Sequence, residues 1–376
     1  MKIGILKETA PHEKRVALVP ETVKKLAAKK IETVVQSGAG LASSFVDAEY
    51  EAAGAKVLPS AEEVVAAADT IVQVARPSME ELGKLKDGQA LVTLIYALSS
   101  ADYVKQLAAK KILSIALELI PRTTLAQAMD VLSSQANLAG YWAVVAAAAR
   151  LPKIFPMLMT AAGTITPARV LIMGVGVAGL QAIGTAKRLG AIVEATDVRP
   201  ETKEQVESLG GKFLMVTGVE YKQGTGGYAV EQSDDYKKAQ ADMVAAAIAK
   251  ADSVVTTALI PGRKAPSLVT EAHVASMRPG SVIVDLAAEQ GGNVAGTVAG
   301  EDVVTKNGVT ILGPVSTASR VAFHASQAFS RNIEKLLLHV TAEGAWKLNL
   351  DEEITKGCVV TKDGEIVHAK VKEAVK

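Results

Sequence analysis

The chain has little of what several classes of protein require. Its single cysteine, Cys358, cannot form an intrachain disulfide, and no Cys or His cluster has metal-ligand spacing. Aromatic residues make up only 4% of the sequence, which disfavours a β-sandwich. The 41 basic residues balance 40 acidic ones, and no block of like charge marks a nucleic-acid footprint. We therefore expect a reducing compartment, no metal and no nucleic-acid partner.

Long apolar runs are also missing. No run reaches the roughly 18 uninterrupted apolar residues that span a bilayer. Met1 leads directly into strand-like sequence without the pattern of a signal peptide. The longest candidate, Leu138 to Leu151, has the length of a buried helix. We expect a soluble, cytoplasmic polypeptide.

What the chain does contain is aliphatic and periodic. Its 376 residues exceed one ordinary core, and the hydrophobic content of 49% is mostly Ala, Val and Leu. Strand-like and helical patterns alternate from Lys2 to Glu118 and again from "ARVLIMG" to "VTILG". This alternation predicts the α/β class, with two doubly wound Rossmann-like domains built on parallel sheets.

The C-terminal part predicts a long helix from Ser319 to Val340, joining the domains, and then a β-hairpin that turns at Asp363-Gly364. The second sheet is complete without this tail, so we expect it to return to the first domain. The predicted domains are residues 1–132 plus 320–376, and residues 133–319.

A glycine motif follows a buried strand at the start of the second domain. Gly174-x-Gly176-x-x-Gly179 lies directly before a helix. In a dinucleotide fold the first glycine allows the tight turn, the second lets backbone approach a pyrophosphate, and the third lets the helix pack on the strand. A glycine triplet alone is weak evidence, but its placement here predicts dinucleotide binding.

Two charged residues at the end of the next strand bear on the choice of nucleotide. Asp197 lies at the distance at which such folds hold the adenosine ribose, and a carboxylate there repels a 2'-phosphate, so NAD is preferred. Arg199 is the alternative, because it could hold a 2'-phosphate. The glycine-rich segment from Thr217, which includes Gly227 and Tyr228, is either a mobile lid or a solvent loop.

A polar stretch, "RTTLAQAMDVLSSQANLAGY" from Arg122 to Tyr141, separates two apolar regions. We expect a loop there, held in one shape by an ion pair between Arg122 and Asp130. Its amides and hydroxyls suit a carboxamide, although loops are also polar simply because they are solvated. None of the five histidines has the setting of a general base, which oxidation of an alcohol or amine requires.

Several segments resemble the family that joins alanine dehydrogenase with the NAD(H)-binding component of proton-translocating nicotinamide nucleotide transhydrogenase. They include "KRVALVP", "SSQANLAGY", "GVGVAGLQAIGTAKRLGA", "ATDVR" and "TTALIPG", and the likeness covers nearly the whole chain. The segments that match the catalytic Lys and His of alanine dehydrogenase read "QVARP" and "VTLIYAL", without either residue. Arg15 is retained, but it cannot oxidise an amine alone. The resemblance therefore favours the transhydrogenase branch.

The resemblance implies roles for individual residues. The hydride-transfer residues would be Arg122, Gln127, Asp130 and Ser133, with Gln127 reaching toward the partner's nucleotide. The NAD(H)-contacting residues would be Thr123, Thr124, Gly174, Gly176, Val177, Ala178, Gly179, Asp197, Val198, Arg199, Gly227, Tyr228 and Leu259. Gly227 and Tyr228 would belong to a mobile lid.

The resemblance also implies an activity and partners. NAD(H) would bind to this chain and exchange hydride directly with NADP(H) on a partner subunit, so that no general acid or base is needed. A membrane-spanning subunit would carry the proton pathway, and the chain would be a homodimer attached peripherally to the inner face of the membrane. The alternatives are an alanine dehydrogenase-type oxidoreductase and an NAD-sensing regulatory protein.

Overall fold

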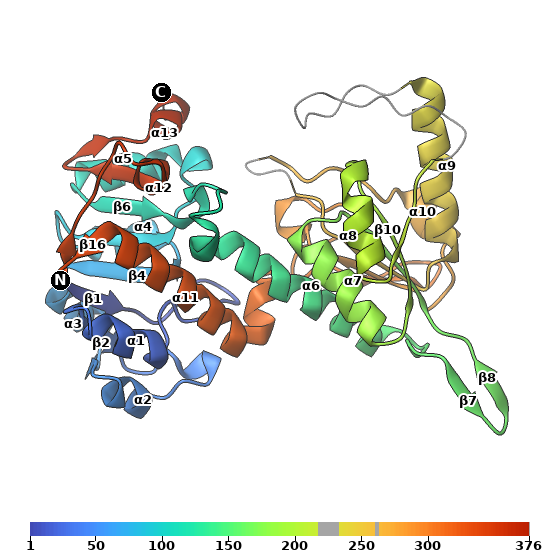
Figure 1. Ribbon diagram of the computed structural model, residues 1–376, viewed down its shortest axis with the longest axis horizontal. Coiled ribbons are helices and arrows are strands. Elements are labelled where there is room, and N and C mark those ends of the chain that lie inside the picture. The colour runs from blue at the N-terminus through green and yellow to red at the C-terminus, as the bar shows by residue number, and fades with distance from the viewer. Residues whose placement is uncertain (217–232, 260–262, 376) are drawn as a thin grey trace. The chain divides into compact units, whose positions relative to one another are not determined.

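The computed structural model describes residues 1–216, 233–259 and 263–375. The chain divides into two compact units (Figure 1). Unit 1 consists of Met1–Gln135 with Ala318–Lys376, and unit 2 consists of Ala136–Thr317. The sequence-based prediction places these boundaries after residues 132 and 319.

Unit 1 is built on an eight-stranded sheet with the order β19-β18-β6-β5-β4-β1-β2-β3. Strands β1 to β6 pair in parallel, and the hairpin β18–β19 adds to β6 antiparallel. The strands are β1 (Lys2–Ile5), β2 (Glu32–Gln36), β3 (Lys56–Leu58), β4 (Thr70–Ala75), β5 (Ala90–Leu94), β6 (Leu113–Ala116), β18 (Val359–Lys362) and β19 (Glu365–Ile366).

Helices cover both faces of this sheet, with a buried apolar cluster under each. The long helix α11 packs Phe329, Ile333, Leu336 and Leu337 into one of these clusters. The helices of unit 1 are α1 (Pro20–Ala27), α2 (Asp47–Ala52), α3 (Ala61–Ala67), α4 (Met79–Lys84), α5 (Ala101–Ala109), α11 (Ala322–Val340), α12 (Glu353–Cys358) and α13 (Ala369–Ala374). A short pair, β16 (Thr341–Ala342) and β17 (Ala345–Trp346), follows α11.

Unit 2 contains a seven-stranded sheet with the order β11-β10-β9-β12-β13-β15-β14. All of its pairings are parallel except β14 with β15. The strands are β9 (Arg169–Met173), β10 (Ile192–Thr196), β11 (Lys212–Phe213), β12 (Ser253–Thr256), β13 (Val282–Asp285), β14 (Asp302–Val304) and β15 (Thr310–Leu312). Its helices are α7 (Val177–Arg188), α8 (Lys203–Ser208), α9 (Asp234–Lys250), α10 (Glu271–Ser276) and most of α6 (Val131–Arg150).

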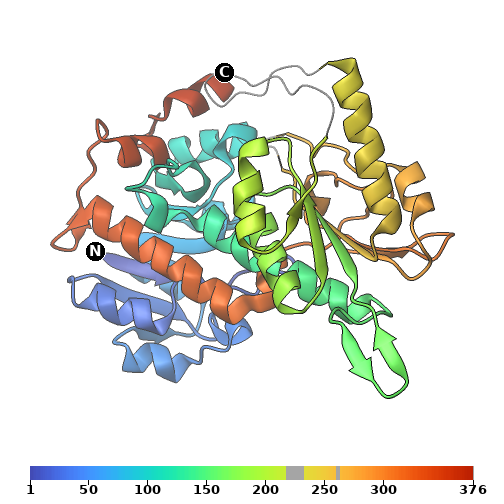
Figure 2. The ribbon, with the colours of Figure 1, turned by 45° about the vertical axis from the view of Figure 1, so that its right-hand side comes forward.

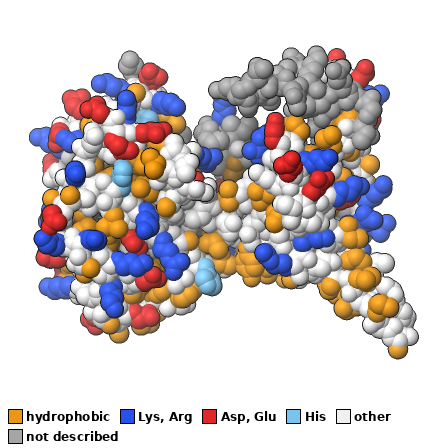
Figure 3. Space-filling view, viewed as in Figure 1, with side chains coloured by type: hydrophobic (Ala, Val, Ile, Leu, Met, Phe, Trp, Pro, Cys, Tyr) orange, Lys and Arg blue, Asp and Glu red, His pale blue; other side chains and the backbone are white. Residues whose placement is uncertain are grey.

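A hairpin projects from the rest of unit 2, as Figure 2 shows. It is formed by β7 (Leu158–Thr160) and β8 (Gly163–Ile165), and all of its strand residues are exposed. Apolar side chains lie on it (Figure 3), and Met159 is 81% exposed. The sequence did not predict this hairpin, because its strands are too short for an alternating pattern.

The predicted fold class of two doubly wound units is confirmed, as is the C-terminal hairpin. Asp363 and Gly364 both have positive φ, 53° and 87°, as the tight turn requires.

The expected loop from Arg122 to Tyr141 is wrong in its second half, because α6 begins at Val131. Among the described residues, no helix combines the length and apolarity needed to cross a bilayer.

Candidate functional site

The glycine turn of unit 2 connects β9 to α7. Gly174 has φ +100°, which L side chains rarely adopt. A Cβ on Gly179 would lie 1.9 Å from the Gly174 carbonyl oxygen, so only glycine fits there. A Cβ on Gly176 would meet no atom of the described residues within 4 Å. The first and third glycines are thus required by the fold, whereas the second keeps a space open.

That open space lies at the start of α7. The N-cap residue Gly176 makes no side-chain cap, and Val177 and Ala178 follow in the first turn. Unpaired N–H groups and the helix dipole favour an anion at such an end. Another glycine, Gly140 on α6, supports this geometry, because its Cβ would lie 2.1 Å from the Ala178 carbonyl oxygen. Sequence reasoning missed Gly140, although a glycine inside a helix was the available signal.

Asp197 and Arg199 lie beside the glycine turn, at the end of β10. The Val175 N–H donates to Asp197 Oδ2 at 2.7 Å, and Arg199 Nε and Nη2 donate to the two carboxylate oxygens at 2.9 and 3.1 Å. Burial acts to raise the pKa of Asp197, but the bonds from Arg199 and Val175 outweigh it and hold that pKa below its ordinary value. Asp197 is therefore an anion aimed at the turn.

A small hollow continues from Asp197. Most of its lining residues have apolar side chains, and they come from β11, from the segments after β10 and β11 and from α9. The lining residues are Asp197, Val198, Pro200, Phe213, Leu214, Met215, Val216, Gln240 and Met243.

The ends of β12 and β13 complete this edge of the sheet. Thr257 Oγ1 donates to the Gly174 carbonyl at 3.0 Å, which ties the β12 end to the glycine turn. Asn293 holds the next residue, accepting from the Ala258 N–H at 3.1 Å and donating to the Ala258 carbonyl at 2.9 Å. Leu259 follows and is exposed.

Asp285 organises these strand ends although it is completely buried. It accepts hydrogen bonds from the Asn293, Val294 and Ala287 N–H groups and from the hydroxyls of Thr256 and Thr297. Five donors compensate a buried carboxylate that would otherwise be costly. Sequence reasoning did not identify Asp285 or Asn293 as supports of this edge of the sheet.

The polar stretch lies in unit 1 as far as Gln135. A 3-10 turn, η4 (Gln127–Met129), precedes Asp130, and the Asn332 side chain on α11 donates to the Ala128 carbonyl at 2.8 Å. Arg122, Thr124 and Gln127 are exposed. The Thr123 hydroxyl oxygen is buried and has no hydrogen-bond partner in the described part of the chain.

Asp130 has a different role from the expected one. Its carboxylate accepts from the Ser133 N–H at 2.9 Å and from the Ser133 hydroxyl at 2.6 Å, which caps the start of α6. The expected ion pair with Arg122 is not formed within residues 1–216. The prediction was wrong because the nearest donors to Asp130 are those of the helix that it begins, and Ser133 accordingly lies on that helix instead of in a loop.

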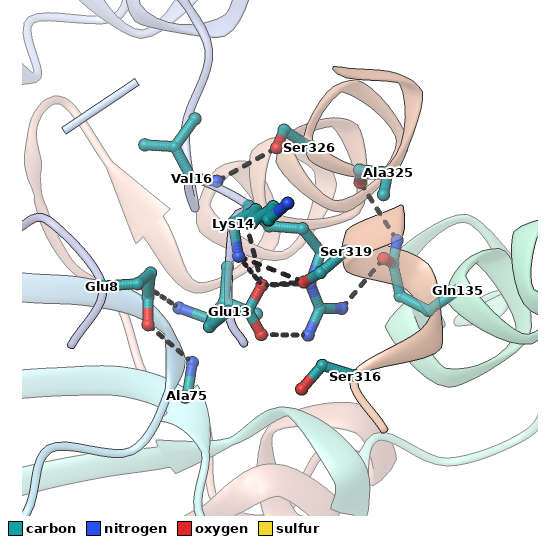
Figure 4. A network of polar contacts seen from close by, with 12 residues as sticks. Glu8, Glu13, Lys14, Val16, Ala75, Gln135, Ser316, Ser319, Ala325 and Ser326 are labelled. Atoms are coloured by element: carbon teal, nitrogen blue, oxygen red, sulfur yellow. Dashed lines mark hydrogen bonds and ion pairs between the residues drawn. The ribbon is translucent and has the colours of Figure 1, made fainter. Parts of the chain in front are cut away.

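Glu13, Gln135 and Ser319 belong to a buried polar network of unit 1 (Figure 4), which also includes Arg15. Arg15 donates to both oxygens of Glu13, at 2.8 and 2.6 Å, and to the Gln135 side chain at 2.9 Å. The Ser319 hydroxyl donates to the same Glu13 carboxylate at 2.5 Å. The Arg15 guanidinium is therefore already engaged by groups of the protein itself.

Glu8 lies beside this network. Its two oxygens accept from the Val74 and Ala75 N–H groups at 2.6 and 3.1 Å. Burial raises the pKa of Glu8 to about 8, against those backbone bonds. These contacts place Glu8 at the end of β4 in a structural role.

Two of the residues predicted to contact the nucleotide, Gly227 and Tyr228, lie outside the described residues. Of the others, unit 2 brings together the glycine turn, Asp197, Val198, Arg199 and Leu259 at one edge of its sheet. Arg122, Thr123, Thr124, Gln127, Asp130 and Ser133 belong to one segment of unit 1. Among the residues described, no group of His, Cys, Asp and Glu has the arrangement of a metal site.

Comparison with known proteins gives matches over nearly all of the chain. The family models for the alanine dehydrogenase/PNT N-terminal and C-terminal domains match residues 4–139 and 143–369. An NAD(P) transhydrogenase subunit alpha polypeptide of Rhodospirillum rubrum is 48% identical over 98% of both chains. A transhydrogenase crystal structure from Sinorhizobium meliloti, 45% identical, superposes with a TM-score of 0.90 over 98% of this chain and 100% of that one. An alanine dehydrogenase of Methanococcus maripaludis is 30% identical over 100% of this chain and 96% of its own.

Proposed function

The chain belongs to the alanine dehydrogenase/PNT family, and within it we propose that it is the NAD(H)-binding alpha subunit of a proton-translocating transhydrogenase. In this role it exchanges hydride between NAD(H) held in unit 2 and NADP(H) held on a partner subunit. The 48% identity to a transhydrogenase subunit, against 30% to an alanine dehydrogenase, supports this branch of the family.

The observation that carries the proposal is the open approach at Gly176. A dinucleotide needs backbone contact at this point, and a Cβ there would meet no atom within 4 Å in the part of the chain that the structure describes. The start of α7 favours the pyrophosphate, Asp197 accepts from the ribose hydroxyls, and the adenine lies beyond Asp197. Asp197 also repels a 2'-phosphate, so NAD(H) is the nucleotide of this unit.

The reaction depends on the positioning of two nicotinamide rings and does not require proton transfer. Hydride moves between the carbons of two nicotinamide rings, and neither ring gains or loses a proton at a heteroatom. Holding two reactants at near-attack distance contributes several kcal/mol, on the order of 7–11 in well-oriented systems. No side chain of this chain has to shuttle a proton in this step.

The segment from Arg122 to Ser133 supplies the positioning groups. The exposed Thr124 and Gln127 offer donors and acceptors for a carboxamide, and the Thr123 hydroxyl oxygen next to them is buried without a partner among the described residues. Asp130 fixes the segment to the start of α6 through Ser133. We assign Gln127 to the nucleotide of the partner subunit.

The hydrogen bonds that Arg15 already makes within the protein weaken the alanine dehydrogenase alternative. A substrate carboxylate would have to compete with Glu13 and Gln135, which already bind this guanidinium. Turnover of L-alanine by this chain alone would favour the alternative, and its measurement is therefore the first control.

Partners follow from the same proposal. NADP(H) is bound by a second subunit, and a membrane-spanning subunit carries the protons, so the chain attaches peripherally to the inner face of the cell membrane. The exposed apolar hairpin β7–β8 supports a homodimer, since a second copy would remove Met157 and Met159 from water.

Reconstitution tests the proposal. The purified chain is mixed with an NADP(H)-binding transhydrogenase subunit, and reduction of an NADP analogue by NADH is followed optically. We expect transfer that requires both proteins. Binding of NADH without any transfer would favour an NAD-sensing protein instead.

A further inference from the structure

A second cavity lies within unit 1, far along the sequence from the glycine turn. It has a volume of about 380 Å³ and is bounded by α3 and α4 and by the residues that follow β1 and β2. Its size is that of a small-molecule site. It contains none of the residues assigned above to NAD(H) or to hydride transfer.

The strand order of unit 1 allows the place of this cavity to be compared with the usual ligand position of the fold. Strands β3-β2-β1-β4-β5-β6 form the doubly wound order, in which the order of the strands across the sheet reverses between β1 and β4. Ligands of such sheets bind at this reversal, outside the carboxyl ends of the strands. The cavity is lined by Leu6 and Lys7 after β1, by Gln36 at the end of β2 and by Pro77 after β4. It therefore lies at the ligand position of the fold.

A buried amide lines the cavity. Gln73 on β4 is 3% exposed, and its Oε1 has no hydrogen-bond partner among the described residues. Its neighbours Val72 and Val74 pack into the cluster under α11, whereas Ile71 packs into the cluster on the α3 side. Because side chains alternate along a strand, Gln73 shares the α3 face with Ile71. A buried carbonyl oxygen on this face lacks a donor.

A comparison within the same unit shows that this is unusual. Gln89 is also buried, but its Nε2 donates to the Val65 and Ala68 carbonyls at 2.8 Å and its Oε1 accepts from the Lys86 N–H at 2.7 Å. The fold thus satisfies one buried glutamine completely, whereas the Oε1 acceptor of the other, a residue of the cavity wall, has no hydrogen-bond partner in the described part of the chain.

Charged side chains of both signs line the cavity. Lys7, Lys84 and Lys86 line it together with Glu62 and Glu81. The Glu81 carboxylate is occupied by the Ser78 N–H and the Thr9 hydroxyl, and Lys84 pairs with Glu80. Lys7 makes no ion pair within residues 1–216. An anionic group of a ligand would find an unpaired ammonium there.

We propose that this cavity binds a nucleoside monophosphate whose base carries an amino group. The amino group donates to Gln73 Oε1, and the phosphate lies near Lys7. No glycine follows β1 before Gly38, so the unit lacks the backbone turn that would hold a pyrophosphate. This is why a mononucleotide, and not a second dinucleotide, fits the site.

Calorimetric titration of the full chain with AMP, GMP and CMP tests the proposal. We expect saturable binding of at least one of them, weakened at least about tenfold by Gln73→Leu, which removes the acceptor. Lys7→Ala should weaken the monophosphate but leave binding of the matching nucleoside unchanged. Absence of binding by all three, or binding that Gln73→Leu does not affect, would overturn the proposal.

Two further arms separate this site from the one in unit 2. Gly176→Ala closes the nucleotide approach of unit 2 and should leave binding of the monophosphate in place, whereas Gln73→Leu should leave NADH binding in place.

The melting temperature without ligand gives an independent readout. Gln89→Leu should lower it, because three hydrogen bonds are lost, and Gln73→Leu should not. Equal losses would show that Gln73 is a structural residue and would end the proposal.

Discussion

Arg199 binds both carboxylate oxygens of Asp197, the residue at the end of β10 that marks the ribose position, with contacts of 2.9 and 3.1 Å. A guanidinium that could attract a 2'-phosphate is thus neutralised by the carboxylate that repels one. The two residues that the sequence offered as alternative determinants of nucleotide preference therefore belong to one ion pair.

Asp197→Asn should shift the preference of the chain from NADH toward NADPH. The change removes the negative charge and frees Arg199 for a 2'-phosphate, so we expect the ratio of the two affinities to fall at least about tenfold. Fluorescence titration with both nucleotides measures it. Asp197→Asn combined with Arg199→Ala is the control, because it should lose NADH affinity without gaining NADPH. An unchanged ratio would remove Asp197 from nucleotide selection.

Gly176→Ala and Gly179→Ala should have opposite consequences. A methyl group on Gly176 meets open space, so the free energy of unfolding should stay within about 0.5 kcal/mol while NADH binding is lost. A methyl group on Gly179 would lie 1.9 Å from the Gly174 carbonyl oxygen, so this variant should be destabilised by about 2 kcal/mol or more. Urea denaturation and NADH titration distinguish the two. Normal NADH affinity in Gly176→Ala would contradict the assigned site.

Gln127→Ala should slow hydride transfer far more than it weakens NADH binding. Its side chain is exposed on η4 and is assigned to the partner's nucleotide, so the loss should appear in the rate, about tenfold or more. Stopped-flow measurements with the NADP(H)-binding subunit give the rate. Gln205→Ala, an exposed glutamine on α8, is the matched control. A rate equal to that of the control would exclude Gln127 from the mechanism.

Asp285→Asn should destabilise unit 2. Five donors converge on this buried carboxylate, and an amide would turn its own N–H groups toward some of them, at a cost of about 3 kcal/mol. Asp302→Asn is the control, since its ion pair with Arg150 is exposed and should contribute less than about 1 kcal/mol. Equal free energies of unfolding for both variants would show that the Asp285 network does not hold the strand ends.

Ionisation of Glu8 should lower the free energy of unfolding of unit 1 as the pH rises. The pKa of Glu8 is about 8 in the folded chain against an ordinary value of 4.5, so the folded state binds the extra proton between these values. This contribution to stability is present below pH 4.5 and is lost through about pH 8, at about 1.4 kcal/mol per pH unit.

The test compares the pH dependence of unfolding in the native chain and in Glu8→Gln. We expect the difference in free energy to move in favour of the variant over that window, whatever its value at low pH, because Gln cannot ionise. Parallel curves would show that Glu8 titrates alike in the folded and unfolded chains.

The fold class and the glycine turn could be predicted from the sequence because both rest on local patterns. Buried strands and helices alternate visibly, and Gly174, Gly176 and Gly179 stand at fixed spacing between a strand and a helix. The hairpin turn at Asp363-Gly364 was equally local, since two residues with positive φ suffice.

The residues that support the site could not be predicted in this way. Gly140 meets Ala178, and Asn293 meets Ala258, because distant segments fold together. The error at Asp130 has the same origin: opposite charges in one polar stretch suggested an ion pair, but the start of α6 offered Asp130 closer donors.

By itself, the sequence determined that this chain alternates strands with helices and carries a dinucleotide turn followed by an acidic residue, since these features depend on neighbours along the backbone. Tertiary structure alone decided which polar groups are satisfied: Arg199 forms an ion pair with Asp197, Glu13 forms one with Arg15, and Gln73 Oε1 has no partner among the described residues. Hydrogen bonding over a few ångströms depends on how strands and helices pack, and no spacing in the chain encodes that directly.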